Sequence, residues 1–159
     1  MEKIKLEINV EYCQANDLTK EEAELVAAAA NATANSYAKY SHFRVGAAVR
    51  LNNGHVMIGA NQENAAFPSG LCAERTVIFA AQANYPDQPI KCLAIAAADD
   101  HGLRAKPVSP CGACRQVILE IEDRYQQPVE ILLCGTEGVY RLKSVKDLLP
   151  FSFVDADMR

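Results

Sequence analysis

The chain has 159 residues, half of them hydrophobic and 23% charged, a balance typical of a soluble globular protein that buries a substantial core. Its formal net charge of −4 offers no attraction to a phosphate backbone, which argues against nucleic acid as the main partner. No apolar run approaches the roughly 20 residues that cross a bilayer, and charges interrupt residues 1–7, so we expect neither a membrane segment nor a secretory signal.

The first half of the chain predicts a strand, a helix and a hairpin. Apolar and polar residues alternate near the N-terminus, which predicts a first strand containing Ile4, Leu6, Ile8 and Val10. Thr19 and Glu22 match a capping box, so a helix should begin there and continue to about residue 36. Two apolar runs, 45–51 and 56–60, are joined by an Asn-Asn-Gly sequence that is typical of a tight β-turn.

The second half alternates helices with buried strands. A loop over 61–71 leads into a helix over 72–83, and a further helix is predicted over 111–125. Apolar runs typical of strands buried on both faces lie at 93–98 and 129–134; a short strand at 139–142 and a short helix at 144–149 follow. This order predicts one domain, residues 1–159, of the α/β class: a mixed β-sheet of about five strands with helices packed on both faces.

Two cysteine motifs carry the chemistry. Cys72-Ala73-Glu74 and Pro110-Cys111-Gly112-Ala113-Cys114 together supply three thiolates and one carboxylate. A structural zinc site normally has four protein ligands, whereas a catalytic one has three and a water. The pattern is the signature of zinc-dependent deaminases, in which the Glu is not a ligand. We therefore predict one Zn²⁺ per chain, held by Cys72, Cys111 and Cys114, with Glu74 as the catalytic acid and base.

Charge imposes a further requirement on this site. Three thiolates and one Zn²⁺ sum to −1, so a positive group should lie nearby. Arg75 and Arg115 each directly follow a motif residue, and Arg75 is the first choice. Both motifs are predicted at helix N-termini, where free backbone N–H groups favour thiolate over thiol.

Other interpretations of the cysteines stay open. A C-x-x-C pair can be redox-active or half of a structural zinc site, whose fourth ligand would come from a histidine or from Cys13, Cys92 or Cys134. Cys92 and Cys134 fall in or beside buried-strand patterns and are expected to be core residues. Without an export signal, the six cysteines are expected to be reduced thiols or metal ligands, which favours the cytoplasm.

With these residues in place, the chain resembles the cytidine deaminase family, in its small homotetrameric type that acts on free nucleosides. Five blocks carry the resemblance in order: residues 41–48, 61–68, 72–76, 110–116 and 148–153. The resemblance implies a three-layer sandwich fold, a homotetramer with shared active sites, and hydrolytic deamination of cytidine and deoxycytidine in pyrimidine salvage.

The resemblance also implies the substrate contacts. Asn61 and Glu63 match the residues that hold the ribose hydroxyls in the family, and Phe43 matches the aromatic beside the pyrimidine. Backbone groups at Ala73 and Ser109 would contact the edge of the base. Phe153 matches a C-terminal phenylalanine that reaches the active site of a neighbouring subunit.

One departure from the family pattern bears on the substrate, because Arg44 stands where the family usually has proline. Arg44 could add charge near the mouth of the site. A deaminase of a modified cytosine nucleoside such as blasticidin S is therefore the alternative enzyme, although Asn61 and Glu63 favour an unmodified ribose. A nucleic-acid-editing deaminase and a non-catalytic zinc-binding protein are weaker alternatives, and the preference between ribose and deoxyribose is not encoded in any motif.

Overall fold

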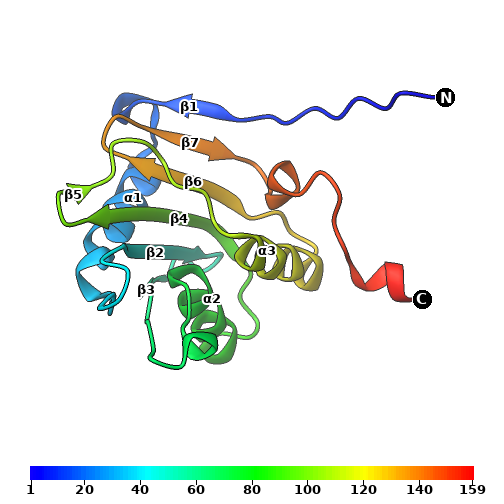
Figure 1. Cartoon of the computed structure of the whole chain (residues 1–159). Helices are drawn as coiled ribbons and strands as arrows, with labels where there is room; N and C mark the ends of the chain where they lie inside the picture. Colours follow the sequence, from blue (N-terminus) through cyan, green and yellow to red (C-terminus); the bar gives the residue numbers. More distant parts are fainter.

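A computed structural model describes all residues, 1–159, and Figure 1 shows one twisted sheet with helices on both sides. The sheet has seven strands in the order β1-β7-β6-β4-β2-β3, with β5 paired to β4. The strands are β1 (Glu11–Cys13), β2 (Arg44–Leu51), β3 (Val56–Ala60), β4 (Ile90–Asp99), β5 (Gly102–Leu103), β6 (Glu130–Gly135) and β7 (Gly138–Leu142). Only β4 and β6 run parallel; the other pairs are antiparallel. The mixed sheet is confirmed, with seven strands where about five were predicted.

Helix α1 (Lys20–Ala32) covers one face of the sheet. Its capping box is confirmed, because Thr19 Oγ1 accepts the Glu22 N–H at 3.2 Å and Glu22 Oε2 accepts the Thr19 N–H at 2.6 Å. Apolar residues of α1 pack against alternate residues of the central strands in one buried cluster that includes Leu25, Ala29, Ala48, Ala94 and Leu132. The helix ends four residues earlier than predicted and continues as a 3₁₀ turn, Thr33–Asn35.

Helices α2 (Ala73–Asn84) and α3 (Gly112–Tyr125) cover the opposite face. The larger core cluster lies there and contains the other set of alternate strand residues, among them Ala47, Val49, Leu93, Ile95 and Leu133. Because successive side chains of a strand point to opposite faces, the apolar β4 fills both cores. This arrangement confirms three layers with helices on both faces.

Close packing brings α2 against the edge of the sheet. A Cβ built on Gly59 of β3 would lie 2.7 Å from the Ala73 carbonyl oxygen and 2.8 Å from the Val77 nitrogen. Such distances are well below van der Waals contact, so only glycine lets the first turn of α2 approach β3 this closely. That turn carries the Cys72 motif.

The hairpin and the later elements are confirmed with small shifts. Gly54 in the β2–β3 turn has φ of +88°, a value that glycine adopts freely. The predicted helix at 144–149 is a 3₁₀ helix, Val145–Leu148. Three further 3₁₀ turns are present: Ala15–Asp17 after β1, Phe67–Ser69 in the loop before α2, and Asp155–Met158 near the C-terminus.

The predicted first strand is wrong for residues 4–10. Strand β1 begins at Glu11, which is paired with Arg141 of β7. Because β7 ends at Leu142, the antiparallel register supplies no partner strand for residues before Val10. Figure 1 shows this N-terminal segment running out from β1 in an extended form, beyond the body of the fold. An alternating pattern specifies which face a strand would bury, but a strand forms only where a neighbour accepts its hydrogen bonds.

None of the helices combines the length and apolar character needed to cross a membrane.

Candidate metal centre and active site

The three motif cysteines lie at the beginnings of two neighbouring helices. Cys72 is the N-cap of α2 and Cys111 is the N-cap of α3, and neither side chain accepts a capping hydrogen bond from its own helix. Cys114 lies in the first turn of α3 and is fully buried. The sequence prediction that both motifs occupy helix N-termini is confirmed, and the free sulfurs of both N-caps are available to a ligand.

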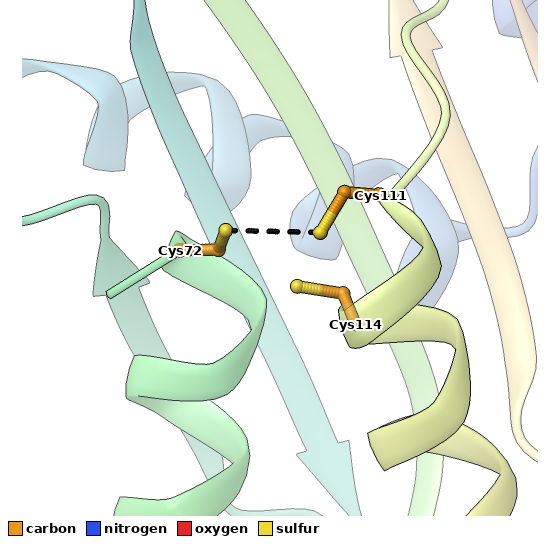
Figure 2. A group of neighbouring side chains, drawn as sticks. All are labelled: Cys72, Cys111 and Cys114. Carbon is orange, nitrogen blue, oxygen red and sulfur yellow. Dashed lines mark hydrogen bonds between the residues drawn. The ribbon is translucent and has the colours of Figure 1, made fainter. Parts of the chain in front are cut away.

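The sulfur atoms converge as a metal site requires. Figure 2 shows the three side chains pointing toward one another from α2 and α3. The Sγ atoms of Cys72 and Cys111 are 3.9 Å apart, and all three Sγ atoms lie within 4.8 Å of one another. Tetrahedral zinc with Zn–S bonds of 2.3 Å places its sulfurs about 3.8 Å apart. The cluster therefore fits one Zn²⁺.

No fourth side chain with a metal-binding atom joins these sulfurs. Cys13, Cys92 and Cys134 are free thiols buried in the strands β1, β4 and β6. Burial raises the pKa of Cys134 to about 12 and also raises the pKa of Cys92, so both remain neutral core residues. This geometry disfavours a closed structural zinc site and agrees with three protein ligands.

Glu74 lies in the first turn of α2 with 5% of its surface exposed, and it lines the cavity in front of the cysteines. Burial raises the pKa of the Glu74 carboxyl, and the charge of Cys72 acts in the same direction. A carboxyl with a raised pKa in a cavity wall accepts a proton more readily than an ordinary glutamate and can release it again, as a general base and acid must. Its position matches a proton carrier beside the metal ligands.

The structure distinguishes the two candidate arginines. Arg75 Nη2 lies 3.5 Å from Cys72 Sγ, whereas Arg115 donates through Nε and Nη1 to the carbonyl oxygens of Pro110 and Leu148, each at 2.9 Å. Arg115 thus ties the start of α3 to the C-terminal region. Arg75 is the positive group at the sulfurs.

Neighbouring groups favour the thiolate form of Cys72. A hydrogen bond from Cys114, with help from Arg75, lowers the pKa of Cys72 to about 5. The same Cys72–Cys114 contact raises the pKa of Cys114, so Cys72 is the stronger acid of the two thiols. A thiolate is the form that ligates zinc.

A cavity of about 490 Å³ opens in front of the cluster. Its wall includes the predicted residues Phe43, Asn61, Glu63, Ala73 and Glu74, together with Cys72 and Cys111. Phe153 is not among the lining residues and is 57% exposed near the C-terminus. The wall of this cavity thus brings these predicted residues together within one chain, and Phe153 lies outside it.

Asn61 and Glu63 are held by contacts with the segment before β2. Asn61 Oδ1 accepts the Val45 N–H at 2.7 Å, and Asn61 Nδ2 donates to the Phe43 carbonyl at 3.1 Å. Glu63 Oε2 accepts the Tyr40 N–H at 2.7 Å. These contacts fix an amide and a carboxylate in the cavity wall, and each keeps hydrogen-bonding capacity for a ligand.

Ser41 is a site residue that the sequence interpretation did not assign. Its hydroxyl donates to Glu63 Oε1 and its N–H to Glu63 Oε2. The Ser41 hydroxyl is also the main reason that the pKa of Glu63 is lowered. The only sequence signal was its place at the start of a motif block.

Arg44 does not point toward the mouth of the cavity. In β2, Val45 lines the cavity, and Arg44 is on the opposite face because neighbouring strand residues alternate. The guanidinium donates to the Asp99 carbonyl and pairs with Asp100 Oδ1 at 3.4 Å. Arg44 therefore anchors the turn after β4, and its charge is removed from the ligand-binding side.

Comparison with known proteins places this geometry in a family. Residues 19–126, more than half of the chain, match the family described as the cytidine and deoxycytidylate deaminase zinc-binding region. The chain belongs to this deaminase family. The resemblance found in the sequence blocks is confirmed.

Individual deaminases match over most of their length. The cytidine deaminase of Halalkalibacterium halodurans is 38% identical over 134 residues, which cover 84% of this chain and 95% of the relative. The cytidine deaminase of Mycobacterium tuberculosis is 37% identical over 125 residues, covering 79% and 84%. The crystal structure of cytidine deaminase from Burkholderia pseudomallei superposes with a TM-score of 0.71 at 38% identity, covering 86% of this chain and all of that one.

Proposed function

We propose that this deaminase-family protein hydrolyses cytidine and deoxycytidine to uridine and deoxyuridine, releasing ammonia, as a step of pyrimidine salvage. The observation that carries the proposal is the convergence of three sulfurs from two helix N-termini beside a buried glutamate in a cavity wall. Three sulfur ligands without a fourth side chain suit a catalytic rather than a structural zinc site.

In this proposal Cys72, Cys111 and Cys114 hold one Zn²⁺ per chain, and Arg75 offsets part of the charge of their sulfurs. Zinc bound there would supply a Lewis acid that lowers the pKa of water into the neutral range.

Glu74 moves the protons of the reaction. Its carboxylate takes one proton from the attacking water and delivers it to the ring nitrogen beside the amino-bearing carbon. After the C–O bond has formed, Glu74 takes the remaining proton from the new hydroxyl group and passes it to the amine, the C–N bond breaks, and ammonia leaves behind a carbonyl group. Burial supports these roles, because it raises the pKa of the carboxyl and so makes Glu74 a better proton acceptor than an exposed glutamate.

The substrate contacts follow the cavity wall. Asn61 and Glu63 would hold the ribose hydroxyls, Phe43 would pack beside the pyrimidine, and backbone groups at Ala73 and Ser109 would contact the base edge. None of the lining residues is lysine or arginine, and a phosphate on the ribose would approach the Glu63 carboxylate without a compensating cation. A free nucleoside is therefore the proposed substrate, in preference to a nucleotide or a nucleic acid.

We propose a homotetramer as the working assembly, in which Phe153 contributes to the site of a neighbouring subunit. The exposure of Phe153 and its distance from the cavity of its own chain support this role. The six free thiols support a cytoplasmic location, since reducing compartments keep cysteines unpaired.

One set of assays tests the proposal. Zinc per chain is measured, and ammonia release is followed from cytidine, deoxycytidine, cytidine monophosphate and blasticidin S. We expect about one zinc per chain, turnover of both nucleosides, and loss of activity on chelation with recovery on adding zinc. Turnover of blasticidin S without cytidine would favour the modified-nucleoside deaminase, and bound zinc without ammonia release from any compound would favour a non-catalytic protein.

A further inference from the structure

The N-terminal segment, residues 1–10, presents an apolar stripe that its own chain covers only in part. Its alternate residues Ile4, Leu6, Ile8 and Val10 are 81, 50, 55 and 45% exposed. The segment makes one hydrogen bond to the rest of the chain, from the Asn9 N–H to Asp147 Oδ1 at 3.3 Å. Residues 1–8 are extended, make no hydrogen bond to the rest of the chain and carry one apolar face, which are the features of an unpaired edge strand.

The stripe continues an aromatic surface of the folded domain. Tyr12 lies in register with Tyr140 of β7, and their rings are 5.4 Å apart. Tyr12 is 53% and Tyr140 39% exposed. Because side chains alternate along an extended chain, Tyr12 lies on the same face as Val10 and Ile8. One apolar strip thus runs from the sheet edge out along the N-terminal segment.

We propose that this segment pairs antiparallel with the same segment of a second copy of the chain, across a two-fold axis at Leu6. Antiparallel pairing of a strand with its own copy is two-fold symmetric, so it closes a dimer contact without leaving a free end. Pairing with the opposite sheet edge, β3, would instead be head-to-tail and open-ended. The inference does not depend on the proposed catalytic activity.

The charges of the segment select the register. With Leu6 opposite Leu6 of the second copy, Ile4 faces Ile8, and Lys5 faces Glu7 twice, once on each side of the axis. Opposite charges in cross-strand pairs stabilise a sheet, whereas like charges directly opposite destabilise it. An axis at Lys5 would oppose two lysines, an axis at Glu7 two glutamates, and an axis at Ile4 would oppose Lys3 to Lys5. An axis at Ile8 would oppose Glu7 to the uncharged Asn9, and Lys5 to Glu11, whose carboxylate already accepts a hydrogen bond from Arg141. An axis between residues would place apolar side chains opposite polar ones, so the apolar rows of the two copies would lie on opposite faces of the pair.

Single-cysteine variants test the contact directly. Directly opposed residues of an antiparallel pair have Cα separations within the range of a disulfide. Leu6→Cys, Lys5→Cys and Glu7→Cys are made in the full-length, zinc-loaded protein and oxidised mildly, and the products are separated without reductant after thiol blocking. We expect covalent dimer from Leu6→Cys well above the wild-type background that the six native cysteines set. Equal or greater cross-linking from Lys5→Cys or Glu7→Cys, or none from any variant, would overturn the proposal.

A charge exchange supplies the second test. Lys5→Glu places two glutamates opposite each other in both cross-strand pairs. Lys5→Glu combined with Glu7→Lys restores opposite charges, with the acidic residue at position 5 and the basic one at position 7. Amide hydrogen exchange of residues 2–10 is measured for the three proteins at one concentration. We expect protection in the wild type, a several-fold loss in the single variant and recovery in the double variant. Equal, unprotected exchange in all three would contradict the pairing, whatever the activity of the protein.

Discussion

Arg75 and Cys72 form the contact that completes the charge arrangement of the site: the guanidinium Nη2 lies 3.5 Å from the sulfur. The two residues stand three positions apart at the start of α2, so one helical turn brings a ligand and its counter-charge together. The Arg75 Nε atom is buried without a partner of its own. Burying an unpaired donor costs free energy. The fold accepts this cost at Arg75, which argues that the guanidinium charge stabilises the sulfur cluster.

Replacing Arg75 by glutamine should weaken zinc binding and activity by about 10–100-fold, the range found when a group that contacts metal ligands is removed. Arg75→Lys keeps the charge and should lose less. Competition with a chromophoric zinc chelator measures the affinity, with ammonia release as the second measurement. Unchanged affinity in Arg75→Gln would show that the cluster needs no counter-charge.

The catalytic role of Glu74 predicts a separation of chemistry from metal binding. Glu74→Gln keeps the size of the side chain but removes the proton-carrying group, so kcat should fall by about 10²–10⁴-fold, while zinc per chain stays unchanged. Glu120→Gln is a matched control, because Glu120 is an exposed glutamate on α3. A Glu74→Gln protein that retains wild-type kcat would remove Glu74 from the mechanism.

Gly59 should control the position of α2. A methyl group at this residue would collide with the Ala73 carbonyl and the Val77 nitrogen, so Gly59→Ala should lower the free energy of unfolding by about 1–3 kcal/mol and reduce zinc affinity. Gly112 has no atom within 4 Å of a built Cβ, and Gly112→Ala is the control for stability. Denaturant unfolding measures both variants. Equal stabilities would mean that α2 shifts freely on β3.

Glu22 should make stability depend on acid pH. Although burial opposes it, hydrogen bonds from Thr19 and Arg141 lower the pKa of Glu22 below its ordinary 4.5. Arg141 holds both carboxylate oxygens at 2.9 Å. A depressed folded-state pKa contributes stability that is present above the unfolded pKa and is lost as pH falls through the folded one.

The corresponding variant is Glu22→Gln, which should lower the free energy of unfolding by about 2 kcal/mol at neutral pH. Its difference from the wild type should shrink as pH falls below 4.5. Denaturant unfolding at a series of pH values measures both proteins, with Glu21→Gln as the exposed control. A difference that stays constant into acid would contradict the prediction.

Local patterns in the sequence predicted much of the fold. The capping box at Thr19 and Glu22, the Asn-Gly turn and the buried apolar strands each depend on neighbouring residues, and the structure confirms them. The alternation at residues 4–10 shows the limit of such patterns. Whether that segment becomes a strand depends on where β7 ends, and β7 lies more than a hundred residues away in the chain.

The sequence alone predicted the candidate site, three sulfurs that form one cluster and a carboxylate in the wall of the same cavity, because cysteine spacing and helix starts are local features. Tertiary structure decided what surrounds them. It selected Arg75 over Arg115, kept Cys92 and Cys134 in the core, and turned Arg44 away from the cavity. It also joined Ser41 to Glu63 across 22 residues. Each of these outcomes depends on where segments that are distant in the sequence meet on the sheet. Packing of the whole chain decides those meeting points.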